Sequence, residues 1–110
     1  MTTLVVGADG QGMRFVLVSS QAATIDTSIE APASQRQEIR SLAAFLHQSK
    51  ISLADIERFV SIELSHSRTS VRVIATLLKT TAWFLDKRYS VLPSGDLHEL
   101  DTATLAERAV

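Results

Sequence analysis

Cysteine is absent from the 110-residue sequence, and its absence excludes several classes of site. Disulfides, thiolate zinc sites and cysteine nucleophiles are not possible, which fits a cytoplasmic protein without requiring one. The sequence also lacks a run of about 20 apolar residues, the length that a membrane span needs. The N-terminal MTTLVVGADG has no basic segment before its short apolar run, so it does not have the pattern of a signal peptide.

An excess of charge of either sign is missing as well. Lysine and arginine number 11 against 12 acidic residues, for a net charge of −1. No basic surplus points to direct contact with nucleic acid, and no acidic tail indicates disorder. The composition that remains, 45% hydrophobic and 21% charged, is typical of one soluble globular domain.

The first 30 residues predict three strands. A β-branched run begins at Leu4, stops at GADGQG and resumes in MRFVLVS; Asp9-Gly10 and Gly12 supply residues tolerant of positive φ, as a tight hairpin requires. AATIDTSIE then alternates apolar and polar residues up to Pro32, a pattern typical of a half-exposed edge strand.

Two helices and two further strands follow. Ser34 and Gln37 have the spacing of a capping box, and a helix is expected over about 34–48 with one stripe toward the core, formed by Ile39, Leu42, Ala43 and Leu46. Ser52 is expected to cap a short turn before the strand RFVSIEL. A second helix is predicted from Ser67 or Thr69 to Lys87, a fifth strand in YSVLP, and a short helix capped by Asp101 or Thr102.

This β-β-β-α-β-α-β order predicts an α/β fold with a mixed five-stranded sheet and helices on one face. We expect residues 1–95 to form a single subdomain and residues 96–110 a C-terminal tail with a short helix.

The second helix carries more apolar surface than one sheet can cover. One stripe, able to dock on a sheet, comprises Val71, Ile74, Ala75, Leu78, Ala82 and Leu85. Another runs along a different side through Val73, Leu77, Thr80 and Phe84, with Trp83 between the two at the helix end. Either the first helix and the tail cover this second side, or it is a subunit interface, because large apolar patches rarely stay bare.

Residues 34–94, from SQRQEIR through SLADIERF and SRTSVRV to YSVLPS, resemble the N-terminal subdomain of TsaB (YeaZ) proteins. These are accessory components of the bacterial machinery that makes threonylcarbamoyladenosine on tRNA. The resemblance implies an actin-like ATPase (ribonuclease H-like) subdomain. It also implies a helical bundle in which the two helices pair with those of a partner.

The family signature at the strand-to-helix junction is degenerate here. That signature is Gly-x-Gly-Pro-Gly-Ser-Phe-Thr-Gly-Val/Leu-Arg, and Ser67, Thr69, Val71 and Arg72 match it. The glycines and the proline are replaced by Ile62, Leu64, Ser65, His66 and Ser70, and Arg68 stands at the aromatic position. Glycine lets backbone amides approach an anion closely. We therefore expect Ser67 or Thr69 to serve as a helix cap, and Arg68 and Arg72 to contact solvent or a partner carboxylate rather than a phosphate.

Other candidate chemistry is weaker. GADGQG leads into a strand, so it lacks the helix N-terminus of a phosphate loop. His47, His66 and His98 are far apart and have no metal-ligand spacing. Ser67 and His66 are adjacent at a helix start and would point in different directions, which disfavours a hydrolytic triad. We expect no catalytic, cofactor-binding or metal-binding residues.

The resulting hypothesis is a non-catalytic, cytoplasmic TsaB-like scaffold that contacts neither nucleic acid directly nor a membrane. Its expected partner is itself, as a homodimer, or a TsaD-type actin-like protein, bound through Val73, Leu77, Thr80, Trp83 and Phe84. The alternative is a small nucleotide- or metabolite-binding domain that completes its site by dimerising. Actin-like proteins hold nucleotide between two subdomains, and the chain ends near the point where a second would begin, so a third interpretation is a fragment of a longer protein.

Overall fold

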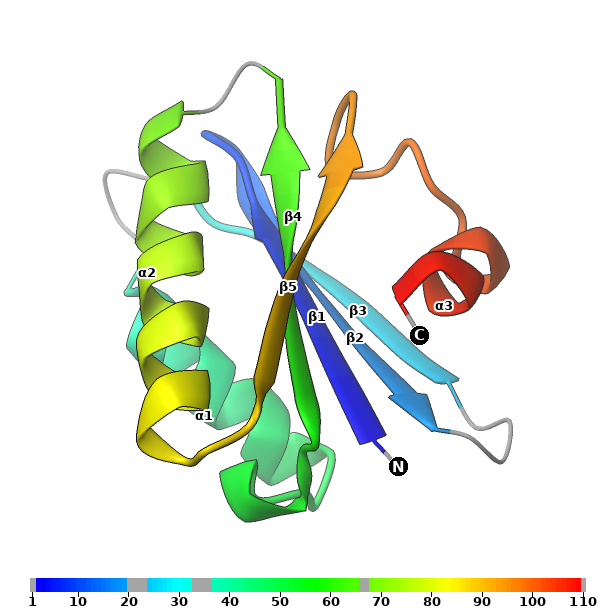
Figure 1. The fold of residues 1–110 in the computed structure, drawn as a ribbon. Helices are drawn as coiled ribbons and strands as arrows, with labels where there is room; N and C mark the ends of the chain where they lie inside the picture. Colours follow the sequence, from blue (N-terminus) through cyan, green and yellow to red (C-terminus); the bar gives the residue numbers. More distant parts are fainter. Residues whose placement is uncertain (1, 20–23, 33–36, 66–67, 110) are drawn as a thin grey trace.

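Five strands form one mixed sheet in the order β3-β2-β1-β4-β5, with helices on both faces (Figure 1). The computed structural model describes residues 2–19, 24–32, 37–65 and 68–109. The elements are β1 (Thr2–Ala8), β2 (Gly12–Ser19), β3 (Thr24–Glu30), α1 (Glu38–Gln48), a 3-10 turn η1 (Leu53–Asp55), β4 (Arg58–Leu64), α2 (Arg68–Phe84), β5 (Arg88–Ser94) and α3 (Thr102–Ala109).

The predicted order of elements and the mixed sheet are confirmed. The first three strands are antiparallel, with Val5 opposite Val16 and Phe15 opposite Thr27. β4 pairs parallel with β1 and β5 pairs parallel with β4. β3 is an edge strand, as its alternation predicted, and none of the described helices is long and apolar enough to cross a membrane.

The hairpin between β1 and β2 closes by a different device from the one expected. No described glycine has a positive φ. Instead, Oδ1 of Asp9 accepts hydrogen bonds from the backbone N–H groups of Gln11 and Gly12, each at 2.8 Å. Gly12 is needed for space, since a Cβ there would lie 2.2 Å from the carbonyl oxygen of Ile29 on β3.

α1 and α2 cover one face of the sheet, as predicted (Figure 1). The predicted stripe of α1 was partly wrong: Leu42 and Leu46 are buried, but Ile39 is 71% exposed and Ala43 is exposed, while Phe45 is buried instead. The Phe45 ring stacks on that of Phe15 with centroids 4.9 Å apart. The helix therefore turns its Phe45 side to the sheet, because stacking two aromatic rings buries more apolar area than an alanine does.

Both helix boundaries on this face differ from the prediction. α1 begins at Glu38, after an extended Gln37 that makes no side-chain cap; Ser34 lies outside the described residues. α2 ends at Phe84 rather than Lys87, because Asp86 adopts φ 55° and the N–H of Lys87 turns back to the carbonyl of Ala82. This is a Schellman C-cap, and Lys50 (φ 58°) forms the same motif after α1. The Ser52 capping box before η1 is confirmed.

α3 packs on the opposite face of the sheet from α1 and α2, a placement that the sequence did not predict (Figure 1). Asp101 caps it by accepting from the N–H of Thr104 at 2.7 Å. Leu97 and Leu105 are almost fully buried against valines and isoleucine of β1, β2 and β4. Gly7 permits this approach, because a Cβ there would lie 2.6 Å from Cδ1 of Leu97.

A buried arginine holds this C-terminal segment to the sheet. Arg14 on β2 is 4% exposed, and its Nε and Nη2 donate to the two carboxylate oxygens of Asp26 on β3 at 3.1 and 2.6 Å. Its Nη1 donates to the carbonyls of Leu97 (3.1 Å) and Leu100 (2.7 Å). The hydroxyl of Thr102, the first residue of α3, donates to the same Asp26 carboxylate at 2.5 Å. One guanidinium thus joins β2, β3 and the tail.

Replacing this guanidinium should be costly. Arg14→Met keeps the apolar stem but leaves the Asp26 carboxylate and two carbonyls without their donor, so we expect the free energy of unfolding to fall by about 3–5 kcal/mol. Chemical denaturation monitored by circular dichroism measures it. Arg40→Met, at an exposed arginine of α1, is the matched control and should change stability by less than about 0.5 kcal/mol. Equal effects of the two substitutions would contradict this role for Arg14.

The same pair predicts an acid-sensitive component of stability. The hydrogen bond from Arg14, with smaller help from Thr102, lowers the pKa of Asp26 although partial burial opposes the shift. A carboxyl whose pKa is lower in the folded state contributes stability that is fully present above its unfolded pKa, about 3.9, and is lost as the pH falls through the lower folded value. Asp26→Asn should therefore lose less stability than the wild type between pH 5 and pH 2 in urea unfolding. Parallel pH profiles for the two proteins would contradict the assignment.

Candidate protein interface

The outer side of α2 carries the second apolar stripe, and the structure leaves it at the surface. Trp83 and Phe84 are 81% and 80% exposed, Val73 is 41% exposed, and Thr80 is exposed. Leu77 is half-buried and packs partly against the core, so it belongs to both sides. The inner stripe, by contrast, buries Ile74, Leu78 and Ala82 completely. The two stripes diverge because residues four apart on a helix share a side and residues one apart do not.

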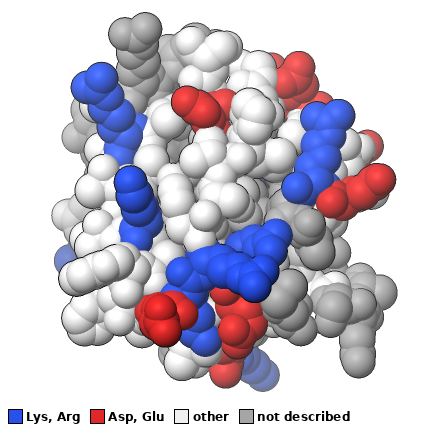
Figure 2. Space-filling model, viewed as in Figure 1, with Lys and Arg blue, Asp and Glu red and all other residues white. Residues whose placement is uncertain are grey.

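α1 and α2 enclose an open groove of about 1090 Å³ on this surface. Val73, Leu77 and Thr80 line it from α2, and Ile39 and Ala43, the residues expected in the core, line it from α1. Glu38, Arg40 and Arg72 supply the charged side chains along it. In the space-filling view the surface over α2 is mostly uncharged, with a few basic side chains (Figure 2). The groove therefore offers an apolar floor with a charged margin.

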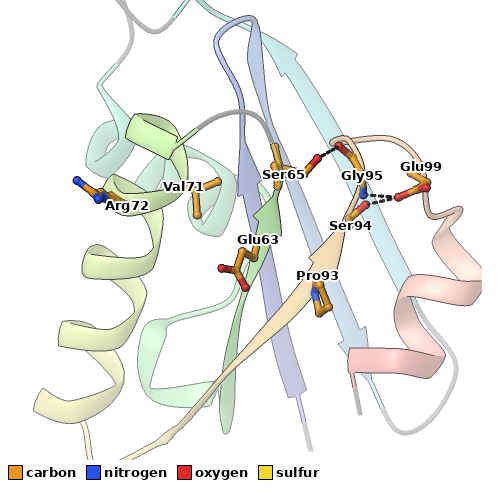
Figure 3. A pocket seen from close by; sticks show the side chains of 9 residues that line it. Glu63, Ser65, Val71, Arg72, Pro93, Ser94, Gly95 and Glu99 are labelled. Atoms are coloured by element: carbon orange, nitrogen blue, oxygen red, sulfur yellow. Dashed lines mark hydrogen bonds between the residues drawn. The ribbon is translucent and has the colours of Figure 1, made fainter.

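A second open groove, of about 760 Å³, lies where β4 and β5 end and α2 begins. It is the place of the degenerate junction. Its lining residues are Glu63, Leu64, Ser65, Val71, Arg72, Pro93, Ser94, Gly95 and Glu99 (Figure 3).

The hydrogen bonds in this groove join its lining residues to one another. Ser65 Oγ donates to the carbonyl of Gly95 at 3.3 Å. The one hydroxyl hydrogen of Ser94 is shared between the carbonyl of Asp96 at 2.7 Å and the Glu99 carboxylate at 3.1 Å, and the N–H of Gly95 donates to that same carboxylate. The side chain of Arg72 points away from these residues, on the far side of α2 (Figure 3). An internal carboxylate thus accepts from the loop N–H and hydroxyl groups that an anionic ligand could otherwise use.

The junction residues named from the sequence are only partly brought together. α2 begins at Arg68, so Thr69 lies inside the first turn and is not the cap residue; Ser67 lies outside the described residues. Arg72 is exposed and borders both grooves, with its side chain on the side of α2 away from the junction groove (Figure 3). The sequence reasoning missed Glu99 and Gly95, and also Arg14, whose one signal was a charge inside the apolar run MRFVLVS. The described residues contain no group of three His, Asp or Glu side chains that could hold a metal ion.

Comparison with known proteins identifies the fold. No protein-family model and no curated protein matches the sequence. Among solved structures, YeaZ from Pseudomonas aeruginosa superposes with a TM-score of 0.71 at 15% identity, covering 87% of this chain and 44% of that one. Archaeoglobus fulgidus Pelota matches with a TM-score of 0.61 at 10% identity, over 99% of this chain and 31% of that one. Thermus thermophilus RuvC, solved with a Holliday junction substrate, gives 0.55 at 9% identity, over 84% and 64%.

These likenesses confirm the predicted fold class, the ribonuclease H-like fold that actin-like proteins share. They also bear out the resemblance to YeaZ read from the sequence, at the level of the fold. The chain spans less than half the length of the YeaZ chain that it matches.

The junction groove generates a prediction about nucleotides. Two carboxylates line it, Glu63 and Glu99, and residues 62–70 contain no glycine, so phosphate would meet negative charge and few accessible amides. Isothermal titration with Mg-ATP should detect no binding tighter than about 1 mM, a loss of at least 4 kcal/mol relative to micromolar binding. A micromolar dissociation constant would contradict this account of the junction.

Proposed function

We propose that this protein is a non-catalytic, TsaB-like scaffold that binds another actin-like protein through the α1–α2 groove and the exposed stripe beside it. The observation that carries the proposal is the exposure of Trp83 and Phe84, about four-fifths each, at the end of an uncharged stripe that continues into the groove. Aromatic side chains exposed next to an apolar groove are typical anchors of protein interfaces.

The energetics favour a bound partner over bare surface. Burying a Phe side chain contributes roughly 1.5–3 kcal/mol, and the Trp side chain is larger. Ile39 of α1, which is 71% exposed, lines the same groove as Val73, Leu77 and Thr80 of the stripe, so exposed apolar side chains of the two helices adjoin one another. Contiguous exposed apolar surface of this kind marks interaction sites in proteins that are otherwise well packed.

The expected partner is a second copy of this chain or a TsaD-type protein, by analogy with the family that the sequence resembles. The likeness of fold to YeaZ supports this choice, as do helices placed so that a four-helix arrangement with a partner is possible. We place the protein in the cytoplasm, in association with threonylcarbamoyladenosine modification of tRNA. A scaffold role without catalysis fits a junction groove in which Glu99 is bound to its own loop.

The groove at the ends of β4 and β5 is the observation that favours the alternative, a small-molecule-binding domain. Ligands of α/β sheets often bind outside the carboxyl ends of parallel strands, which is where this groove lies. The carboxylates that line it disfavour a nucleotide. Titration of Mg-ATP against the intact protein tests the nucleotide-binding form of this alternative.

A double substitution on the outer stripe tests the interface. Val73→Glu with Phe84→Glu places two charges on the stripe without touching Ile74, Leu78 or Ala82, so the fold should persist. Binding to a TsaD-type protein from the same source, and any self-association through this face, should weaken at least tenfold, about 1.4 kcal/mol. Calorimetry and light scattering measure the association, and circular dichroism checks the fold.

The control is Ile25→Glu, on β3, where the side chain is 40% exposed and therefore comparable to Val73. It should leave binding unchanged. The proposal fails if the wild type neither binds a TsaD-type protein nor self-associates, or if the folded double variant associates as well as the wild type does.

A further inference from the structure

β5 forms an edge of the sheet, and no described strand pairs with its outer side. In Figure 1 it lies at the front, and its outer edge is not covered by any of the helices. An edge strand presents a row of unpaired N–H and C=O groups that can pair with another strand. At its centre Val91 is 46% exposed.

The charges at the two ends of β5 are opposite. At the N-terminal end Arg88 lies beside Arg58 of β4, and like charges in register repel each other. Lys87 is paired with Glu57 at 3.4 Å, whereas the Arg88 guanidinium has no ion pair or hydrogen bond within the described part of the chain. At the C-terminal end the Glu99 carboxylate is bound at Ser94. Figure 2 shows mostly uncharged side chains over the middle of this face, acidic side chains above them, and basic side chains together with acidic ones below.

We propose that β5 pairs with β5 of a second copy, antiparallel and centred on Val91, so that the two five-stranded sheets become one continuous sheet. This surface is separate from the α1–α2 groove, and the proposal does not depend on the proposed function. When a strand pairs antiparallel with its own copy about a two-fold axis, the N-terminal end of each strand lies beside the C-terminal end of the other. Opposite charges at the two ends, as at β5, therefore attract each other across the pair.

The register places specific side chains together. Val91 meets Val91 of the second copy, and Arg88 lies opposite Ser94 of the second copy. Arg88 and Ser94 lie on the face of the sheet on which α3 packs. Ser94 pairs with Leu64, which belongs to the core on that face, and Arg88 is six residues from Ser94, so the two side chains point to the same side. The guanidinium therefore comes beside the Glu99 carboxylate that Ser94 binds. Pro93 lacks an N–H but lies near the end of the strand, so it removes at most one hydrogen bond from each end of the pairing.

Charge reversal tests contact between two molecules, because mixing two variants can restore the association that each variant alone has lost. Arg88→Glu and Glu99→Arg, each alone, put like charges together at both ends of the pairing and should weaken dimerisation at least tenfold. An equimolar mixture of the two variants restores opposite charges at both ends and should form a heterodimer, detected by analytical ultracentrifugation at 10 μM to 1 mM protein. Mixing that produces no dimer from two folded variants overturns the proposal.

Val91→Lys is a second test of the same pairing, which does not depend on Glu99→Arg leaving its loop undisturbed. It places a charge at the centre of the strand and should weaken the wild-type dimer at least tenfold. Ile25→Lys, on the opposite edge strand β3 at a similar exposure (40% against 46%), is the control and should leave this equilibrium unchanged. A wild type that is monomeric at 1 mM overturns the proposal. So does a dimer lost with Val73→Lys, on the α2 stripe, and kept with Val91→Lys, a result that would instead support the interface on α1 and α2.

Discussion

The buried guanidinium of Arg14 is the constraint on which the arrangement of this protein depends. A charge that is 4% exposed is tolerated only when its donors are satisfied, and here Asp26 and the carbonyls of Leu97 and Leu100 satisfy them. Two of these partners belong to the C-terminal segment. The sheet can therefore bury Arg14 only with that segment in place, and the segment in turn covers the valines and isoleucine of the second face.

This constraint reaches the end of the sheet where a ligand would be expected. The segment held by Arg14 begins immediately after β5, so its position brings Glu99 back onto Ser94 and Gly95. The carboxylate accepts hydrogen bonds from a backbone N–H and a hydroxyl at the carboxyl end of the parallel strands. The family signature that the sequence resembles has glycines at the neighbouring junction of β4 and α2, whereas this chain has none in residues 62–70 and has an internal acidic contact beside them.

The exposed surfaces of α2 and β5 follow from geometry that a single small domain cannot avoid. A helix with two apolar stripes can bury only one of them on a sheet, and here Ile74, Leu78 and Ala82 are inside while Trp83 and Phe84 remain outside. A sheet that does not close has two edges, and β5 has its exposed valine and its opposite charges on one of them. The two surfaces lie on different elements and can act separately.

The sequence by itself determined the strands, the helices and their order, the Ser52 cap, a cap for the last helix at Asp101 or Thr102, and the second apolar stripe of α2, because each depends on periodicity or on neighbours a few residues away. Only the tertiary structure decided the rest. The side that α1 turns inward depends on Phe15, thirty residues earlier than Phe45. The need for glycine at position 12 comes from Ile29 on another strand, and the partners of Arg14 lie 12 to 86 residues away. A local pattern shows that a side chain must be buried or must find hydrogen-bond partners. Which residues become its partners is decided only when distant segments pack together.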